Sequence, residues 1–266
     1  MLAILFDATQ CVGCNKCVQA CVEKNRLDAE IPDPTTEADG LSGRRRTSIV
    51  LVPGTKRHVK KQCLHCLEPN CQSACLVGAM KKTPEGPVLY DADKCIGCRY
   101  CMLACPVGIP RYQWDQPLPY VQKCDFCYDL VKVGQKPACV AACPHQALFQ
   151  GGRDEMLALA REKIQAGPDQ YLDHIYGEHE IGGTNVFYLS DVPLEAVLRF
   201  PANVGSMPIP EMTWPVINKT PVVALTVLGS LIGTYWIIER RMKLAREGED
   251  PPAGRDPHDQ RGDRHE

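Results

Sequence analysis

The chain has 266 residues, with 16 cysteines, 22 prolines, 21 glycines and a formal net charge of −2. This length allows one large domain or two small ones around a hydrophobic core, and the proline and glycine content favours a loop-rich protein. The lack of stacking aromatics beside the main run of basic residues argues against nucleic acid as a partner. An even number of cysteines permits a disulfide framework, but such frameworks belong mostly to short secreted domains and do not recur as tight runs of four.

The cysteines form four groups of four, here called quartets, which organise the chain up to about residue 150. Quartet one is Cys11, Cys14, Cys17 and Cys21, and quartet two is Cys63, Cys66, Cys71 and Cys75. Quartet three is Cys95, Cys98, Cys101 and Cys105, and quartet four is Cys124, Cys127, Cys139 and Cys143. No cysteine is left over, so we expect residues 1–150 to form one domain with four sites of four ligands each.

Short strands are predicted around the quartets. They lie at residues 3–6, 48–52, 88–90 and 147–149, where β-branched and aromatic residues gather. Between quartets one and two, residues 24–43 contain prolines and a glycine and predict a long excursion without regular structure.

A basic run precedes quartet two. Residues 44–61 contain Arg44, Arg45, Arg46, Lys56, Arg57, Lys60 and Lys61 and no acidic residue. The simplest interpretation is a solvated basic loop. Two others are partial compensation of negative charge at the cysteine sites, which raises a reduction potential, and docking to an acidic partner.

The cysteine spacing points to iron–sulfur chemistry. Quartets one and three have the spacing C-x2-C-x2-C-x3-C, and Pro106 follows the last cysteine of quartet three. This is the spacing of bacterial two-cluster ferredoxins, in which the fourth cysteine ligates the other cluster. Gly13 and Gly97 lie inside these loops, where a residue without Cβ lets the backbone close around a cubane. Quartets two and four are length variants, with x4 and x11 insertions, and Pro144 follows the second of them.

Zinc is the competing metal, because paired CxxC motifs are also typical of zinc ribbons. Zinc gives no reason for a third cysteine two residues further on, nor for the proline after the fourth. His65 and His145 lie beside quartets two and four, but the sixteen cysteines already fill four sites, so we expect both histidines to be supporting or surface residues.

Downstream of the quartets, residues 151–221 are predicted to form an extension and linker. Residues 154–166 predict an amphipathic helix, and residues 185–189 predict a strand. Four prolines between residues 208 and 221 indicate an extended linker. Residues 222–238 are an uncharged apolar run, and residues 239–266 are a polar tail that we expect to be disordered beyond Arg246.

Several strings resemble one known family: KKQCLHCLEPNC (60–71), CIGCRYCMLACPVGIPRYQWD (95–115), KCDFC (123–127), GQKPACVAACP (134–144) and HIYGEHEIGGTNVFYLSDVP (174–193). The family comprises the four-cluster ferredoxin-like subunits of molybdopterin enzymes and membrane-bound hydrogenases, including formate dehydrogenase beta subunits. The similarity covers nearly the whole chain. The RYQWD and IYGE…GGT strings look closer to the iron–sulfur subunit of membrane-bound nickel–iron uptake hydrogenase.

The resemblance implies an α+β fold of two pseudo-twofold-related ferredoxin-like halves, irregular and stabilised by four 4Fe–4S clusters, with one C-terminal transmembrane helix. It implies that Cys143 joins Cys11, Cys14 and Cys17, and that Cys21 joins Cys124, Cys127 and Cys139. It likewise implies that Cys75 joins Cys95, Cys98 and Cys101, and that Cys105 joins Cys63, Cys66 and Cys71. Val22 and Leu76 stand where many members have proline, which affects loop rigidity and not ligation.

The apolar run 222–238 is predicted to cross a membrane. As a helix it spans about 26 Å, slightly less than a hydrocarbon core of about 30 Å, and flanking Tyr235, Trp236 and Arg240 can absorb the difference. Gly229 and Gly233 form a GxxxG surface suited to a partner helix. The alternative is a buried core helix.

The topology signals conflict. Four basic residues follow the run and only Lys219 closely precedes it, so the positive-inside rule places the C-terminus in the cytoplasm and the cysteine domain outside. Residues 1–7 lack the length and flanks of a signal peptide, whereas hydrogenase-type relatives often carry a twin-arginine signal. Export with a signal-bearing partner, a leader before the recorded start and a cytoplasmic domain all stay open, and we favour the external placement.

The predicted function is electron transfer without catalysis, because no Rossmann or P-loop pattern and no spare cysteine pair is present. The chain would relay electrons between a catalytic subunit, by resemblance a nickel–iron hydrogenase, and an integral membrane quinone-reactive or cytochrome b subunit. The alternatives are the beta subunit of a formate dehydrogenase or another molybdopterin oxidoreductase, a structural zinc-binding scaffold, and a soluble ferredoxin.

Overall fold

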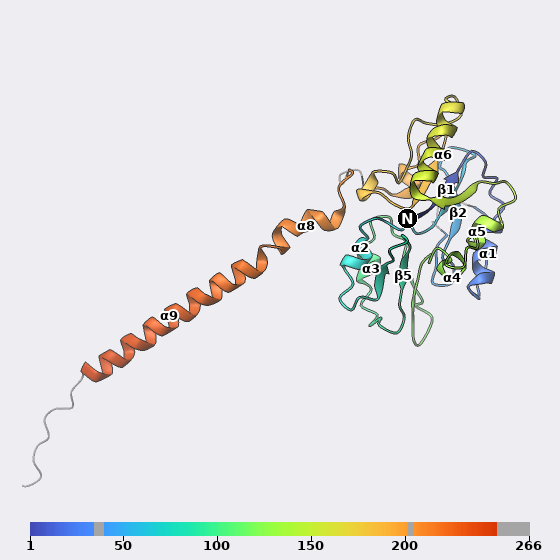
Figure 1. The fold of residues 1–266 in the computed structure, drawn as a ribbon. Coiled ribbons are helices and arrows are strands. Elements are labelled where there is room, and N and C mark those ends of the chain that lie inside the picture. Colours follow the sequence, from blue (N-terminus) through green and yellow to red (C-terminus); the bar gives the residue numbers. More distant parts are fainter. Residues whose placement is uncertain (35–39, 202–204, 249–266) are drawn as a thin grey trace, which may run out of the picture. The chain divides into compact units, whose positions relative to one another are not determined.

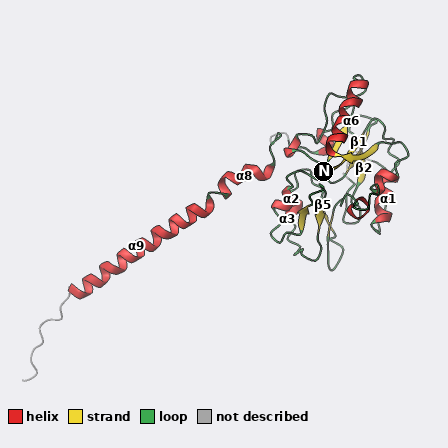
Figure 2. Cartoon of the chain, viewed as in Figure 1, coloured by secondary structure: helices red, strands yellow, loops and turns green. Residues whose placement is uncertain are grey.

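A computed structural model describes residues 1–34, 40–201 and 205–248. The chain divides into two compact units, Met1–Met212 and Thr213–Glu266, each of which is described by itself. The first unit holds all sixteen cysteines. Figure 2 shows that much of it is loop, with short helices and small sheets. The predicted α+β class is therefore confirmed at the level of mixed helices and small sheets.

A three-stranded sheet organises the first unit. Its central strand is β1 (Leu2–Asp7), flanked by antiparallel β8 (Leu148–Gly152) and parallel β9 (Val186–Leu189), so that the two ends of the unit's sequence meet in one sheet. Side chains alternate along β1. Ile4 and Phe6 contact the core on the cysteine side, whereas Ala3 and Leu5 contact a second core beneath α6 (Arg153–Ala166). Figure 1 shows α6 lying beside β1.

Three two-stranded antiparallel ladders join the quartets. They are β2 (Ser48–Leu51) with β3 (His58–Lys61), β4 (Met80–Lys82) with β5 (Val88–Tyr90), and β6 (Arg111–Tyr112) with β7 (Val121–Gln122). The short helices of the quartets are α1 (Lys16–Lys24), α2 (Asn70–Ser73), α3 (Tyr100–Ala104), α4 (Tyr128–Val131) and α5 (Ala138–Ala141). The strands predicted at residues 3–6, 48–52, 88–90, 147–149 and 185–189 are all present, with no end shifted by more than three residues.

The extension after the quartets packs into the same unit. The predicted helix over 154–166 is α6, with Met156, Leu157 and Ala160 buried. A 3-10 turn (Glu180–Gly182) precedes β9, and α7 (Glu195–Leu198) follows it.

The prediction of an extended linker from residue 208 to 221 is wrong, because α8 (Ile209–Ile217) occupies most of it. Pro210 and Pro221 lie in the first turns of α8 and of α9 (Thr220–Gly248), where a missing N–H costs no hydrogen bond. The prolines thus mark helix starts, with only Pro215 inside a helix.

The second unit contains α9, which covers the predicted apolar run. The helical stretch Ile209–Gly248 is long and apolar enough to cross a membrane, with a mean hydropathy of 1.8 in its most apolar window, and none of the described α9 side chains is buried. The helix continues to Gly248, so the first ten residues of the predicted polar tail are helical. The disorder predicted beyond Arg246 falls mainly on residues 249–266, which lie outside the described residues.

Candidate metal centres

The first two cysteines of every quartet are joined by a loop with one left-handed residue directly before the second cysteine. These residues are Gly13 (φ 76°), His65 (φ 50°), Gly97 (φ 71°) and Phe126 (φ 64°). At Gly13 a Cβ would lie 2.6 Å from the ring of His58, and at Gly97 it would lie 2.8 Å from the Tyr112 hydroxyl. The two predicted glycines are therefore required by both conformation and close approach.

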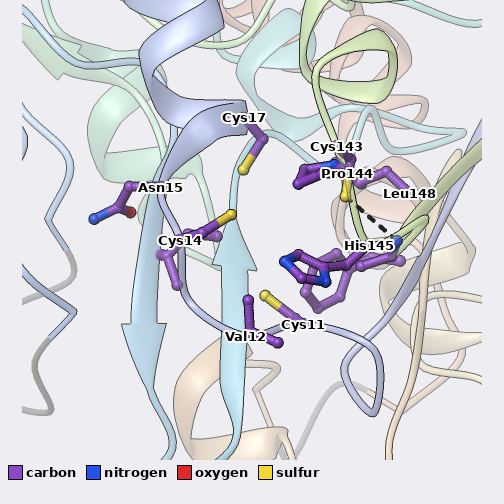
Figure 3. Close-up of a pocket in the computed structure, with 12 residues that line it drawn as sticks. Cys11, Val12, Cys14, Asn15, Cys17, Cys143, Pro144, His145 and Leu148 are labelled. Atoms are coloured by element: carbon purple, nitrogen blue, oxygen red, sulfur yellow. Dashed lines mark hydrogen bonds between the residues drawn. The ribbon is translucent and has the colours of Figure 1, made fainter.

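The first group of sulfurs surrounds one cavity. Figure 3 shows the Sγ atoms of Cys11, Cys14, Cys17 and Cys143 directed toward this common space, so residues more than 120 positions apart in the sequence meet there. Burial raises the pKa of Cys11 and of Cys17 to about 11, and the nearby Cys143 adds to both shifts. Apolar walls from β1 and β2 close the cavity.

The second group lines a second cavity and comprises Cys63, Cys66, Cys71 and Cys105. Burial raises the pKa of Cys71 to about 12, followed by the charge of Cys63, while Lys123 acts in the opposite direction. The pKa of Cys66 lies well above its usual value, because of burial first and then Cys63, Cys105 and Cys71.

The remaining eight cysteines are grouped by their mutual electrostatics. Burial raises the pKa of Cys139 to about 11 and holds that of Cys124 well above its usual value, with Cys21 among the charges that raise both. Burial raises the pKa of Cys127 to about 11, and the charge of Cys139 is among those that add to the rise. Around Cys101, whose pKa burial raises to about 11, the charges that add to the rise are Cys95, Cys75 and Cys98.

Hydrogen bonds from N–H groups reach the last cysteine of every quartet. The backbone N–H four residues later donates to Sγ at Cys75 (3.1 Å, from Ala79), Cys105 (3.4 Å, from Ile109) and Cys143 (3.3 Å, from Ala147). In quartet one, α1 continues past Cys21, and the side-chain amide of Asn25 donates to Sγ instead, at 3.6 Å. Sequence analysis missed Asn25, although its position four residues after Cys21 was the available signal. Such bonds stabilise thiolate sulfur and tune cluster potentials.

The basic run before quartet two is not a solvated loop, contrary to the simplest interpretation. Arg44 pairs with Asp115, Arg46 with Asp125 at 2.7 Å and Arg57 with Asp191 at 2.7 Å. These pairs tie the run to distant parts of the fold.

Lys60 and Lys61 are buried. The pKa of Lys60 is raised: burial by itself lowers it, but the charges of Cys139, Cys17, Cys124 and Cys21 together outweigh that effect. Two further lysines outside the run approach quartet two. Lys123 lies 3.9 Å from Cys63 Sγ, and Lys82 donates to the carbonyls of His65 (3.1 Å) and Cys66 (2.6 Å).

His65 is fully buried, and its Nδ1 accepts a hydrogen bond from the Val88 N–H at 2.8 Å. Burial, with Lys123 and Lys82 nearby, holds its pKa well below the usual value, so the ring is neutral. It packs edge-on against Phe126, with ring centroids 5.1 Å apart. His145 lines the first cavity.

The thiol arrangement fits a cluster with four corners. Zinc thiolates bind at about 2.3 Å, so a zinc site draws its ligands around one point. In the part of the chain that the structure describes, no three His, Cys, Asp or Glu side chains converge in that way. A cubane cluster holds its four ligands further apart than zinc does. Each of the two cavities has four cysteine side chains in its lining.

Comparison with known proteins agrees with this chemistry. Residues 55–153 match the family model described as a 4Fe-4S dicluster domain. The chain is 36% identical over 233 residues to the hydrogenase-2 operon protein HybA of Escherichia coli O157:H7, covering 73% of this chain and 71% of that protein. The chain belongs to the iron–sulfur electron-transfer subunits of hydrogenase and formate dehydrogenase complexes.

Two other relatives are similar to most of the chain. A protein of Nitratidesulfovibrio vulgaris is 40% identical over 258 residues, covering 92% of this chain and 68% of its own length. The iron–sulfur subunit of the nitrate-inducible formate dehydrogenase of Escherichia coli K12 is 34% identical over 201 residues, covering 71% and 67%. Identity is thus higher for the hydrogenase-type relative, in the order that the sequence motifs predicted. This iron–sulfur subunit carries 4Fe–4S clusters, as its sixteen cysteines and its family indicate.

Proposed function

We propose that the chain binds four 4Fe–4S clusters with the crossed ligand sets implied by its motifs. The sets are Cys11, Cys14, Cys17 and Cys143; Cys21, Cys124, Cys127 and Cys139; Cys63, Cys66, Cys71 and Cys105; and Cys75, Cys95, Cys98 and Cys101. The first and third sets are supported by the two cysteine-lined cavities. The other two are supported by the electrostatic neighbours of Cys124 and Cys101.

The two halves are related by a pseudo-twofold axis. Quartets one and three share their spacing, and the strands beside them correspond: β1 precedes quartet one and pairs with β8 after quartet four, just as β5 precedes quartet three and pairs with β4 after quartet two. The β2–β3 and β6–β7 ladders correspond in the same way. His65 and Phe126 are equivalent residues in their loops, and their contact lies where the halves meet.

The electrostatic neighbours of the cysteines support an arrangement of the four sites in a line, and this order supports the proposed function. Cys17 acts electrostatically on Cys139, Cys101 acts on Cys71, and Cys124 and Cys63 both act on the buried Tyr188 between them. The set with Cys21 has all four of its members buried, whereas Cys14, in the first set, is exposed. Electrons would therefore reach the line at the end that contains Cys14, and the protein shields the set with Cys21 from water.

The chain thus acts as a non-catalytic electron wire in an oxidoreductase complex. The clusters supply one-electron transfer, and the residues around them exclude water and donate hydrogen bonds to the thiolates. The catalytic partner is a hydrogenase-type subunit, by the higher identity to HybA, with a formate dehydrogenase or other molybdopterin enzyme as the alternative. A structural zinc scaffold is the alternative of another class.

The other partner is an integral membrane quinone-reactive or cytochrome b subunit, which α9 would contact through the GxxxG surface of Gly229 and Gly233. As a single-pass anchor with basic residues after the apolar run, α9 orients the C-terminus to the cytoplasm and the cluster unit to the periplasm.

Metal analysis tests the four-cluster proposal. Anaerobically purified protein should contain about sixteen iron and sixteen sulfide per chain, because four sites of four irons each are expected. About eight iron, or stoichiometric zinc, would contradict it and favour a two-cluster or scaffold role.

A further inference from the structure

Two fully enclosed lysines lie at the centre of the first unit. Lys60 has no exposed surface and Lys123 has 3%. Lys60 Nζ donates to the Gln62 side chain, and Lys123 Nζ donates to the carbonyls of Val88 and Cys124. Among the described residues, no carboxylate lies within ion-pair distance of either ammonium group. A buried charge without a partner is strongly unfavourable, so both need negative charge nearby.

The negative charge comes from the cysteine sites, in a crossed arrangement. Lys60 precedes quartet two in the sequence, yet the charges that act on it most strongly are Cys139, Cys17, Cys124 and Cys21, of quartets one and four. Lys123 precedes quartet four directly, yet its ammonium lies 3.9 Å from Cys63 Sγ and it acts on Cys71. Each lysine thus faces the cluster set of the other half.

These positions lie at the junction between the two inner sets. The Tyr188 hydroxyl donates to the Lys60 carbonyl at 3.0 Å. The pKa of the same hydroxyl is raised by burial and then by the charges of Cys124 and Cys63. By contrast, the charges acting most strongly on Cys101, in the outer set of quartet three, are other cysteines. The buried cations thus lie near the two inner sets, and Lys60 also lies near Cys17 of the first set, whereas no lysine of the described residues is among the charges acting on Cys101.

A nearby cation favours the reduced form, because reduction adds one electron to a site that is already negative. The effect is large in a low-dielectric interior, where solvent does not screen it. We propose that Lys60 raises the reduction potential of the cluster held by Cys21, Cys124, Cys127 and Cys139, and that Lys123 raises that of the cluster held by Cys63, Cys66, Cys71 and Cys105. The two inner clusters are then easier to reduce than the outer cluster of quartet three. This inference rests on the proposed ligand sets.

The test is an EPR-monitored redox titration of the full chain in its purified complex, with Lys60→Met and Lys123→Met compared with the natural protein. Cys127→Ser and Cys71→Ser identify which signal belongs to each inner cluster. Lys60→Met should shift the Cys127 signal to lower potential, with a smaller shift for the Cys11 set, and Lys123→Met should shift the Cys71 signal. The matched control is Lys94→Met: Lys94 directly precedes Cys95, but it pairs with Asp91 at 3.2 Å and its side chain is 60% exposed.

Lys60→Arg and Lys123→Arg separate the effect of charge from that of packing. Both variants keep the positive charge and should keep the reduction potentials. They also test the inference if a Met variant loses iron. Three results would overturn the inference. A Met variant could shift all signals equally, each lysine variant could shift the signal assigned to the other lysine, or Lys94→Met could give shifts as large as those of the buried lysines. Iron content separates the two proposals. Sixteen irons with unchanged potentials refutes the lysine role alone, whereas a natural protein with fewer clusters refutes the proposed sets and the inference with them.

Discussion

At the scale of single residues, the cysteine loops depend on conformation and close approach as well as on thiols. The left-handed position before the second cysteine is glycine in quartets one and three, but His65 and Phe126 in the other two. Glycine is needed at Gly13, where the His58 ring leaves no room for Cβ. His65 and Phe126 occupy this position in the other two loops, where both side chains are buried and pack edge-on against each other.

Exchange of the fourth ligand is testable at Cys105. Cys105→Ala should damage the cluster of Cys63, Cys66 and Cys71, because Cys105 lines their cavity. EPR of the variant should lose that signal and retain the one assigned to Cys95, Cys98 and Cys101. Cys101→Ala is the control and should give the reverse pattern. Loss of the Cys95 signal in Cys105→Ala would show that the assignment is wrong.

Gly13→Ala should destabilise the chain more than Gly54→Ala. Both glycines have nearly the same φ, 76° and 74°, so the conformational cost of about 1–2 kcal/mol is shared. Only at Gly13 does the new Cβ meet another group, the His58 ring, whereas nothing lies within 4 Å at Gly54. We expect Gly13→Ala to lose about 1 kcal/mol more stability than Gly54→Ala. At a fixed heating rate, its cluster absorbance should disappear at a temperature roughly 2–4 °C lower. Equal losses would mean that His58 moves away freely.

At the scale of elements, α6 and the three-stranded sheet connect the cysteine region to the extension after it. Asp7, at the end of β1, is fully buried and accepts hydrogen bonds from Tyr171 (2.8 Å) and Lys163 (3.0 Å). Lys163 is in the last turn of α6, so one ion pair joins this helix to the central strand.

Lys163→Met should cost about 3 kcal/mol, because it leaves a buried carboxylate without its cation. The matched control is Arg161→Met on the same helix, which removes the pair between Glu178 and an arginine whose side chain is 54% exposed, and it should cost about 0–1 kcal/mol. The measurement is the denaturant midpoint of the cluster-loaded protein. Similar midpoints for both variants would show that Tyr171 and Thr9 suffice to hold the Asp7 carboxylate.

At the scale of the whole molecule, the cysteines and the apolar helix belong to separate compact units. Deleting residues 222–266 should therefore leave a soluble protein with the same iron per chain as the full-length form, since every cysteine lies before residue 144. Co-purification with the membrane fraction should be lost. A truncated protein that loses iron would show that α9 contributes to folding of the first unit.

Topology is testable with a reporter that is active only in the periplasm. Fused after Glu266 it should be silent, because Arg240, Arg241, Lys243 and Arg246 hold that end in the cytoplasm. Fused after Lys219, directly before α9, it should be active. The opposite pattern would place the clusters in the cytoplasm.

The sequence alone determined the local chemistry. Cysteine spacing sets the length of each loop, Gly13 and Gly97 permit its turn, and a run of apolar residues predicts a membrane helix, because each of these signals depends on neighbours in the chain. The same local signals misled where their meaning depends on context. The prolines at 210 and 221 favour an extended linker by their local pattern, yet proline is equally suited to the first turn of a helix, where the structure places both.

Only the tertiary structure decided which distant residues meet. It brought Cys143 beside Cys11, joined β9 to β1, and enclosed Lys60 among cysteines of quartets one and four. The pattern of the basic run does not show that Lys60 is enclosed among cysteines while arginines of the run form ion pairs. Burial and charge compensation depend on long-range packing. For the same reason spacing could predict that the fourth cysteine is exchanged, whereas the cavity that contains Cys105 came from the fold.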